Sequence, residues 1–334
     1  MSTLGAQMTS INTNTAAISA LANLRQTDSS LNGIQDRIST GYRVAKAADN
    51  ASYWSIGTTM KSDDKAMAAV GDSLSIADAL VDTAYTGTKA IIGYVNEIKA
   101  RLVSAREPGV DKDKVGKEIT ELKSQIVSTV KSSSFNGQNW LYDSTSNTGP
   151  IADNQLSAAF VRGATNMVGV GTLTVKAPIN SSGGRGMLIS DRADFNGLLT
   201  ERKAVSQGDG FGGTTTKNYF LIRSQAGSAG TEVTLSTSTA DVDVDGMVSA
   251  IDYYAQTLTD YAADLGASKA RIALQTKFNN DLRDAVNIGV GKLIDADMNS
   301  ESAKLKATQT QKQLGIQALS IANSAGDSIL SLFR

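Results

Sequence analysis

Apolar residues recur at alternating steps of four and three over a long stretch that begins at Ile56 and ends at Leu102. This spacing places them on one face of an α-helix. Because one register holds throughout, the pattern predicts a single helix of roughly 70 Å at about 1.5 Å per residue, far longer than the globular norm. The face comprises Ile56, Met60, Met67, Val70, Leu74, Ala77, Val81, Ala84, Ile91, Val95, Ile98 and Leu102, with Asp63 and Thr88 as polar exceptions.

A break and a second helix follow. Arg106-Glu107-Pro108-Gly109 ends the first helix, because proline cannot continue it and glycine supplies turn geometry. Asp111 is a suitable N-cap for a helix whose apolar face is Val115, Ile119, Leu122, Ile126 and Val130. The two helices predict an antiparallel hairpin, and Asn136-Gly137 just beyond it predicts a tight turn.

The helical pattern returns near residue 251 with a heptad repeat formed by Ile251, Leu258, Leu265 and Ile272. Tyr254, Tyr261 and Leu282 occupy the complementary positions, and Val286 continues the first series. We expect this arm to pack along the two earlier helices as the third member of a bundle. Trp54 and Trp140 are predicted to be packing anchors of that bundle, because aromatic side chains bury large areas.

Residues 144–251 differ in character, with many Gly, Ser, Thr and Asp residues. Short β-like runs occur at Thr172–Val175, Tyr219–Ile222 and Val233–Leu235. The predicted fold class is therefore mainly α. It is a long antiparallel helical bundle or coiled coil built from both ends of the chain, with a small β-rich central domain inserted.

The first and last forty residues set scattered apolar side chains among Ser, Thr, Asn, Gln and Ala. One interpretation is that these segments bury too little to offset chain entropy and become ordered helices only against neighbouring copies. The other is that they are ordinary helices of the chain's own core. Pattern alone leaves both open. Arg43 and Asp49 likewise either bridge neighbouring subunits or stabilise the start of the long helix.

Composition argues against several classes of function. The chain has no cysteine and no histidine, which removes thiolate chemistry, the commonest general base and the commonest metal ligand. A net charge of −1 indicates no nucleic-acid surface and no polybasic membrane patch. We expect no enzyme activity, no cofactor and no bound metal. Asp295 and Asp297 are interpreted as solvated linker residues, and the alternating Asp241, Asp243 and Asp245 as a strand edge or a helix start.

No apolar run is long enough to span a membrane. The N-terminus lacks the basic-then-apolar pattern of a cleavable secretory signal. If the protein leaves the cell, we expect other machinery to export it.

Several motifs resemble those of bacterial flagellins, in the same order along the chain. Near the N-terminus these are Arg37-Ile38-Ser39-Thr40-Gly41-Tyr42-Arg43-Val44 and Ala47-Ala48-Asp49-Asn50-Ala51. Towards the C-terminus they are Arg271-Ile272, Phe278, Ile294-Asp295-Ala296-Asp297, Gln313, Gly315, Asn323 and Ile329-Leu330-Ser331-Leu332. The resemblance covers residues 8–143 and 252–334, and it rests on no motif in the middle third.

The resemblance implies three domains. Residues 1–42 with 292–334 would form an inner layer of terminal helices, and residues 43–143 with 252–291 an outer helical bundle with a β-hairpin. Residues 144–251 would face outward as a variable β-rich domain. The residues expected at subunit interfaces are Ile11, Ile18, Leu21, Leu24, Leu31, Ile34, Ile38, Arg43, Asp49, Leu305, Leu314, Leu319, Asn323, Leu330 and Leu332.

The resemblance also implies a function, namely a structural subunit that polymerises into the extracellular flagellar filament used for swimming. Expected partners are other flagellin subunits, hook-associated and cap proteins, and an export chaperone that shields the C-terminal helix. Export would be through the flagellar type III secretion channel. Two alternatives stay open: a hook–filament junction protein, and a secreted coiled-coil adhesin whose β-rich centre binds a ligand.

Overall fold

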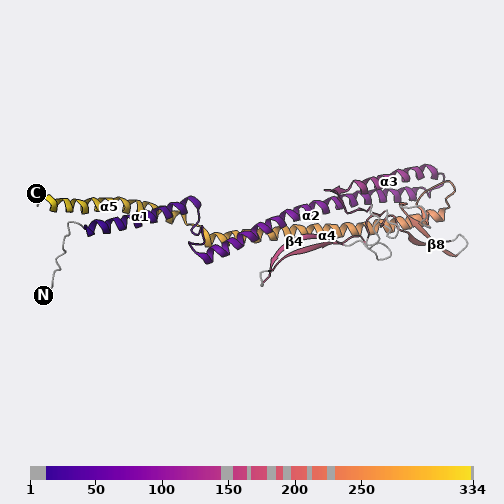
Figure 1. Ribbon diagram of the computed structural model, residues 1–334. Coiled ribbons are helices and arrows are strands. Elements are labelled where there is room, and N and C mark those ends of the chain that lie inside the picture. The colour runs from indigo at the N-terminus through magenta and orange to yellow at the C-terminus, as the bar shows by residue number, and fades with distance from the viewer. Residues whose placement is uncertain are drawn as a thin grey trace. The chain divides into compact units, whose positions relative to one another are not determined.

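The computed structural model describes residues 13–143, 153–163, 167–178, 186–190, 197–208, 213–223 and 230–331, the last with side chains to residue 324. Its helices are α1 Thr15–Thr40, α2 Ala51–Ser104, α3 Lys112–Ser132, α4 Asp241–Ile294 and α5 Met298–Ser331 (Figure 1). The chain divides into two compact units, one of Met1–Lys65 with Asp284–Arg334 and one of Ala66–Arg283. The finer division into three domains stays a prediction.

In the Ala66–Arg283 unit, α2 and α4 run antiparallel. The amide of Asn279 donates to the Met67 carbonyl at 3.0 Å, and Lys99 pairs with Asp252 at 2.5 Å further along the two helices. The predicted face of α2 is the buried one from Met67 to Leu102, and Thr88 joins it by donating its hydroxyl to the Ala84 carbonyl at 2.8 Å. The predictions of one long helix and of an antiparallel bundle are confirmed.

Helix α3 lies beside the C-terminal part of α2 (Figure 1), as the predicted hairpin requires. Asp111 caps it, because its carboxylate accepts from the Asp113 amide at 3.1 Å. Asn136 and Gly137 both have positive φ, at 49° and 77°, the geometry of the two-residue turn that joins antiparallel strands β1 (Ser134–Phe135) and β2 (Gln138–Asn139).

The central region contributes short strands rather than a large sheet. Strands β4 (Asn154–Arg162) and β5 (Val168–Val175) form an antiparallel pair. Strands β7 (Lys203–Gly208), β8 (Thr214–Phe220) and β9 (Thr231–Glu232) form a second sheet, and β3 (Tyr142–Asp143) pairs in parallel with β6 (Ile189–Ser190). The predicted strand at Thr172–Val175 is confirmed, whereas Leu221, Ile222 and Val233–Leu235 lie outside the strands.

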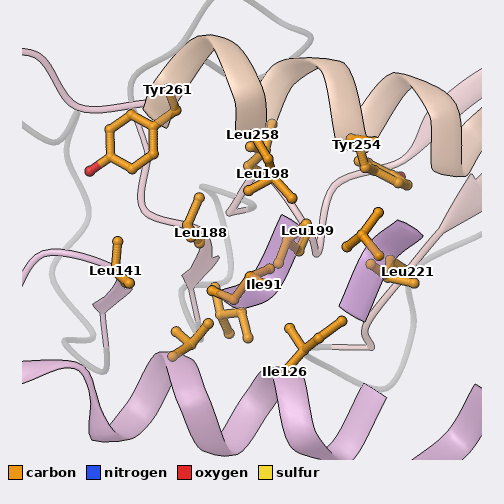
Figure 2. Packing of buried hydrophobic residues seen from close by; sticks show 14 of the residues in the cluster. Ile91, Ile126, Leu141, Leu188, Leu198, Leu199, Leu221, Tyr254, Leu258 and Tyr261 are labelled. Carbon is orange, nitrogen blue, oxygen red and sulfur yellow. The ribbon is translucent and has the colours of Figure 1, made fainter. Parts of the chain in front are cut away.

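A hydrophobic core joins these strands to the helices. Figure 2 shows Ile91 of α2, Ile126 of α3 and Tyr254 and Leu258 of α4 converging on residues of the central region. From that region come Leu141, Leu188, Leu198, Leu199 and Leu221, which are almost fully buried. The mainly helical fold class with a small strand-containing centre is thereby confirmed.

Three side chains depart from the predicted pattern. Trp140 is buried at 7% exposure, as predicted, but Trp54 is 39% exposed and is not a packing anchor. Ile56 and Leu282 belong to the predicted apolar faces, but they are 46% and 37% exposed. The physical reason is that a heptad pattern identifies a helix face but not how far along the helix a partner covers it.

Candidate assembly surface on the terminal helices

Helices α1 and α5 have clear local signals at their ends. The Asn14 side chain caps α1 by accepting from the Ala17 amide at 3.0 Å, and Gly41 ends it in the left-handed region at φ 74°. Glycine adopts that conformation without a Cβ clash, which makes it the usual residue after a helix. Asp297 accepts from the Asn299 amide at 3.0 Å at the start of α5. Asp297 therefore has a local capping role, consistent with its interpretation as a linker residue.

The two terminal helices pack antiparallel. The Asn14 amide donates to the Ala322 carbonyl at 2.8 Å at one end of the pair. At the other end the Arg37 guanidinium lies 3.0 Å from the Glu301 carboxylate. Figure 1 shows α1 and α5 side by side between these contacts.

The seam between α1 and α5 follows steps of three and four on both helices. On α1 the buried and half-buried positions include Ala17, Ala20, Leu24, Leu31, Ile34 and Ile38. On α5 they include Glu301, Leu305, Thr308, Lys312, Gly315, Leu319 and Ala322. Many of these side chains are small or polar, so the seam has the spacing of a coiled coil but little of its apolar content.

The remaining apolar side chains of the pair point away from the seam. Ile18 is 60% exposed and Leu21 is 37% exposed on α1, while Leu314 is 58% exposed on α5. Ile316 and Ile321 of α5 are also exposed, at 51% and 71%. The residues predicted at subunit interfaces do not include these two. Ile321 lies seven residues after Leu314, so this spacing places both side chains on the same exposed face of α5.

The predicted interface residues therefore fall into distinct groups. Leu31 and Ile34 are buried within the chain itself, at 8% and 5% exposure. Half-buried positions are Leu24, Ile38, Leu305 and Leu319, and exposed positions are Ile18, Leu21, Leu314 and Asn323. Ile11 and Leu332, and the side chain of Leu330, lie outside the described residues.

Charged side chains occupy the seam where apolar residues are missing. Glu301, 7% exposed in its side chain, accepts from Lys304 at 2.8 Å and from Arg37 at 3.0 Å. Hydrogen bonds from Lys304 first, and then from Arg37, hold the pKa of the Glu301 carboxyl below its ordinary value against the opposing effect of burial. Lys312 lies 2.8 Å from Asp28. These contacts fix the register of the two helices.

The loop after α1 is held by backbone contacts to the end of α4. The Arg43 amide donates to the Ile294 carbonyl at 2.7 Å, and its guanidinium donates to the Leu293 carbonyl at 2.8 Å. Val44 packs in a small cluster with Val290 and Ile294. The hydrogen bonds give Arg43 a local structural role, and the Val44 cluster holds the same loop.

Asp49 lies in the same loop and accepts from the Ala45 and Lys46 amides at 3.0 and 2.9 Å. Arg43 and Asp49 thus both stabilise local structure, and both line one open groove at the surface. Their part in contacts between subunits stays a prediction.

This surface offers shape and apolar area rather than reactive groups. In the described part of the chain, no three carboxylates or other metal-ligating side chains come close enough together to hold a metal ion. None of the described helices is both long and apolar enough to cross a membrane. The terminal pair carries exposed apolar side chains on both helices.

Comparison with known proteins identifies both ends of the chain. Residues 11–146 match the bacterial flagellin N-terminal helical region, and residues 248–333 match the bacterial flagellin C-terminal helical region. Flagellin C of Rhizobium meliloti strain 1021 is 47% identical over 98% of this chain and its own full length. A flagellin of Brucella melitensis biotype 1 is 40% identical, and Flagellin A of Rhizobium meliloti is 39% identical, each over 98% of this chain and 100% of the relative.

Proposed function

The chain belongs to the bacterial flagellin family, and we propose that its terminal helices α1 and α5 are completed by packing against further copies in the filament. As a member of that family it is a structural subunit of the extracellular flagellar filament and polymerises with other flagellin subunits. The proposal concerns how assembly and folding of the terminal helices are coupled.

The observation that carries the proposal is the unequal distribution of apolar side chains in the α1–α5 pair. Ordering a helix costs conformational entropy at every residue, and burial of apolar side chains is the main term that offsets this cost. Within the described part of the pair, Leu31 and Ile34 are the large apolar side chains that are buried, and the other large apolar side chains are half-buried or exposed. The pair alone is therefore only weakly stabilised.

Covering the exposed side chains would supply the missing contribution. Ile18, Leu314 and Ile321 are the most exposed, and they lie on both helices. Neighbouring copies carry the same pair, so each subunit can cover part of the next. On this proposal the predicted interface residues act in two ways. Leu31 and Ile34 hold α1 to α5, and the exposed set holds one pair to another.

The same property suits export and handling of the subunit. Terminal helices that gain order only on assembly can pass through a secretion channel as unfolded chain. The exposed apolar side chains of α5, including Leu314, Ile316 and Ile321, are a suitable surface for an export chaperone. We extend the proposal to delivery beneath a cap protein and to contact with hook-associated proteins at the filament base. We propose no catalytic role and no cofactor.

A junction protein and an adhesin are the alternatives. The relatives that match over their full length are named flagellins, which favours the filament subunit over both. An adhesin would show ordered terminal helices in the isolated chain and would form a small closed oligomer. A junction protein would add a thin layer to seeds and then stop.

The test is seeded polymerisation followed by electron microscopy, with hydrogen exchange of α1 and α5 measured before and after assembly. The full chain should extend filament seeds without limit, and amides of both helices should exchange fast in the monomer and slowly in the filament. A chain that lacks residues 300–334 should not extend seeds. Amides that are already strongly protected in the monomer would contradict the coupling of folding to assembly, even if filaments form.

A further inference from the structure

Helix α3 accompanies only part of α2 within the Ala66–Arg283 unit. Its C-cap, Ser133, lies against Gly87 of α2, where an added Cβ would clash with the Ser133 hydroxyl. Because α3 runs antiparallel to α2, the stretch of α2 from Met67 to Gly87 lies beyond the end of α3 (Figure 1). This stretch and the part of α4 that packs on it are here termed the two-helix stretch.

The apolar side chains of the two-helix stretch form a seam that does not fix its own register. Val70, Leu74 and Ala77 of α2 and Ile272 of α4 are at most 7% exposed. Apolar contact is non-directional, so a seam of this kind stays buried when one helix slides along the other by a turn. Selecting one register requires a directional contact that crosses from helix to helix.

Asn279 of α4 supplies such a contact. It is 4% exposed, and its side-chain amide donates across the seam to the Met67 carbonyl at 3.0 Å. Gly71 lies one turn further along α2, and a Cβ added there would lie 3.3 Å from the Asn279 amide nitrogen. The missing side chain at Gly71 therefore leaves room for the amide, although glycine lowers the stability of a helix interior.

Two other buried polar side chains of the α2–α4 pair bond within their own helix. Thr88 and Ser268 are 0% and 6% exposed, and each donates its hydroxyl at 2.8 Å to the carbonyl four residues earlier. These bonds persist in any register, because they do not cross between the helices. Lys269 does pair across the helices with Asp82, but at exposed positions, where an ion pair contributes little.

We infer that Asn279 is a positioning residue that sets the register of α4 on α2 in the two-helix stretch. A single polar side chain buried in an apolar helix seam specifies register at some cost in stability. Sliding by one helical turn, about 5 Å, would carry the amide away from the Met67 carbonyl and leave it buried without a partner. The other registers are thereby disfavoured, and each subunit presents the same arrangement of the two helices.

The test measures the distance between spin labels on the two helices in the full-length monomer. The chain has no cysteine, so labels attach only at introduced thiols. Ile76→Cys on α2 and Leu274→Cys on α4 place both labels at exposed positions of the two-helix stretch. The labelled chain should give one narrow distance distribution. Adding Asn279→Leu should broaden it, by up to the length of one helical turn, about 5 Å.

Urea unfolding of the same variants separates the setting of register from a merely structural role. Leucine has a similar volume, and the Met67 carbonyl keeps its bond within α2, so Asn279→Leu should unfold at the same or a higher urea concentration. Thr88→Val is the matched control, because it removes a buried polar group that does not cross the seam, and it should leave the distribution narrow. A narrow distribution in Asn279→Leu would overturn the inference. A lowered urea midpoint in Asn279→Leu would overturn it too, since lost order would then follow from lost stability.

Discussion

Two glycines in helix interiors of the same unit give a paired prediction of opposite sign. A Cβ added at Gly116 of α3 would lie 2.3 Å from the Leu235 carbonyl oxygen and 3.2 Å from its carbon. A Cβ added at Gly93 of α2 would have no heavy atom within 4 Å. Gly116 therefore permits close approach of the segment that follows β9 to α3, while Gly93 has no such role. The perturbation is the same Gly→Ala change at each site.

The magnitudes follow from helix propensity and from the clash. Alanine is about 0.8–1.0 kcal/mol more favourable than glycine inside a helix, so Gly93→Ala should raise the free energy of unfolding by about that amount. Gly116→Ala has the same gain but forces a backbone carbonyl to move, and overpacking costs about 1–3 kcal/mol. Because a carbonyl cannot rotate away as a side chain can, we expect the upper part of that range. The net loss at Gly116 is then about 1–2 kcal/mol.

The assay is thermal unfolding of the isolated chain, followed by circular dichroism. The Ala66–Arg283 unit falls in the size range where 1 kcal/mol shifts Tm by about 2–4 °C. Gly93→Ala should therefore unfold a few degrees higher than the original chain and Gly116→Ala a few degrees lower. Equal Tm values for the two variants would refute the reasoning, since they would show that the Leu235 carbonyl does not rest on α3.

Three further predictions concern burial and charge. Lys123 is 7% exposed and pairs with Glu232, so Lys123→Met should lower the free energy of unfolding by about 1–3 kcal/mol. Urea unfolding measures this change. A double variant at Lys123 and Glu232 that loses as much as the two single variants combined would contradict the pairing. Ile98→Ala should cost about 2–5 kcal/mol in the same assay, whereas Val103→Ala, at a 53% exposed position, should change stability by less than about 0.5 kcal/mol. The pKa of the Glu301 carboxyl is lowered, so its stabilisation of the α1–α5 pair is present above pH 4.5 and is lost as the pH falls through the lowered pKa. In filaments, where the proposed function has both helices ordered, Glu301→Gln should remove that acid dependence of helicity. An unchanged acid titration of the variant filaments would refute the role.

The amino-acid sequence determined the helical parts of this protein closely, because helices and turns depend on residues near one another in the chain. The spacing from Met67 to Leu102 identified the buried face of α2, and Pro108 with Gly109 located its end. Asp111 and Asn136-Gly137 have local hydrogen-bonding and backbone preferences that predict a cap and a turn wherever they occur. The spaced motifs at both ends also indicated the family.

Only the tertiary structure decided which apolar side chains are covered and which strands pair. Trp54 and Leu282 match buried patterns in composition and spacing, yet both are exposed, because burial depends on the partner element that lies over each turn. Strands β3 and β6 pair across a long sequence separation, which no local pattern encodes. The composition of Val233–Leu235 predicts a strand, but the segment lies outside the strands. Val233 is nevertheless buried at 0% exposure and packs in the core. The terminal helices show the same division: their sequence predicts helices, but the contacts that bury them depend on what packs alongside.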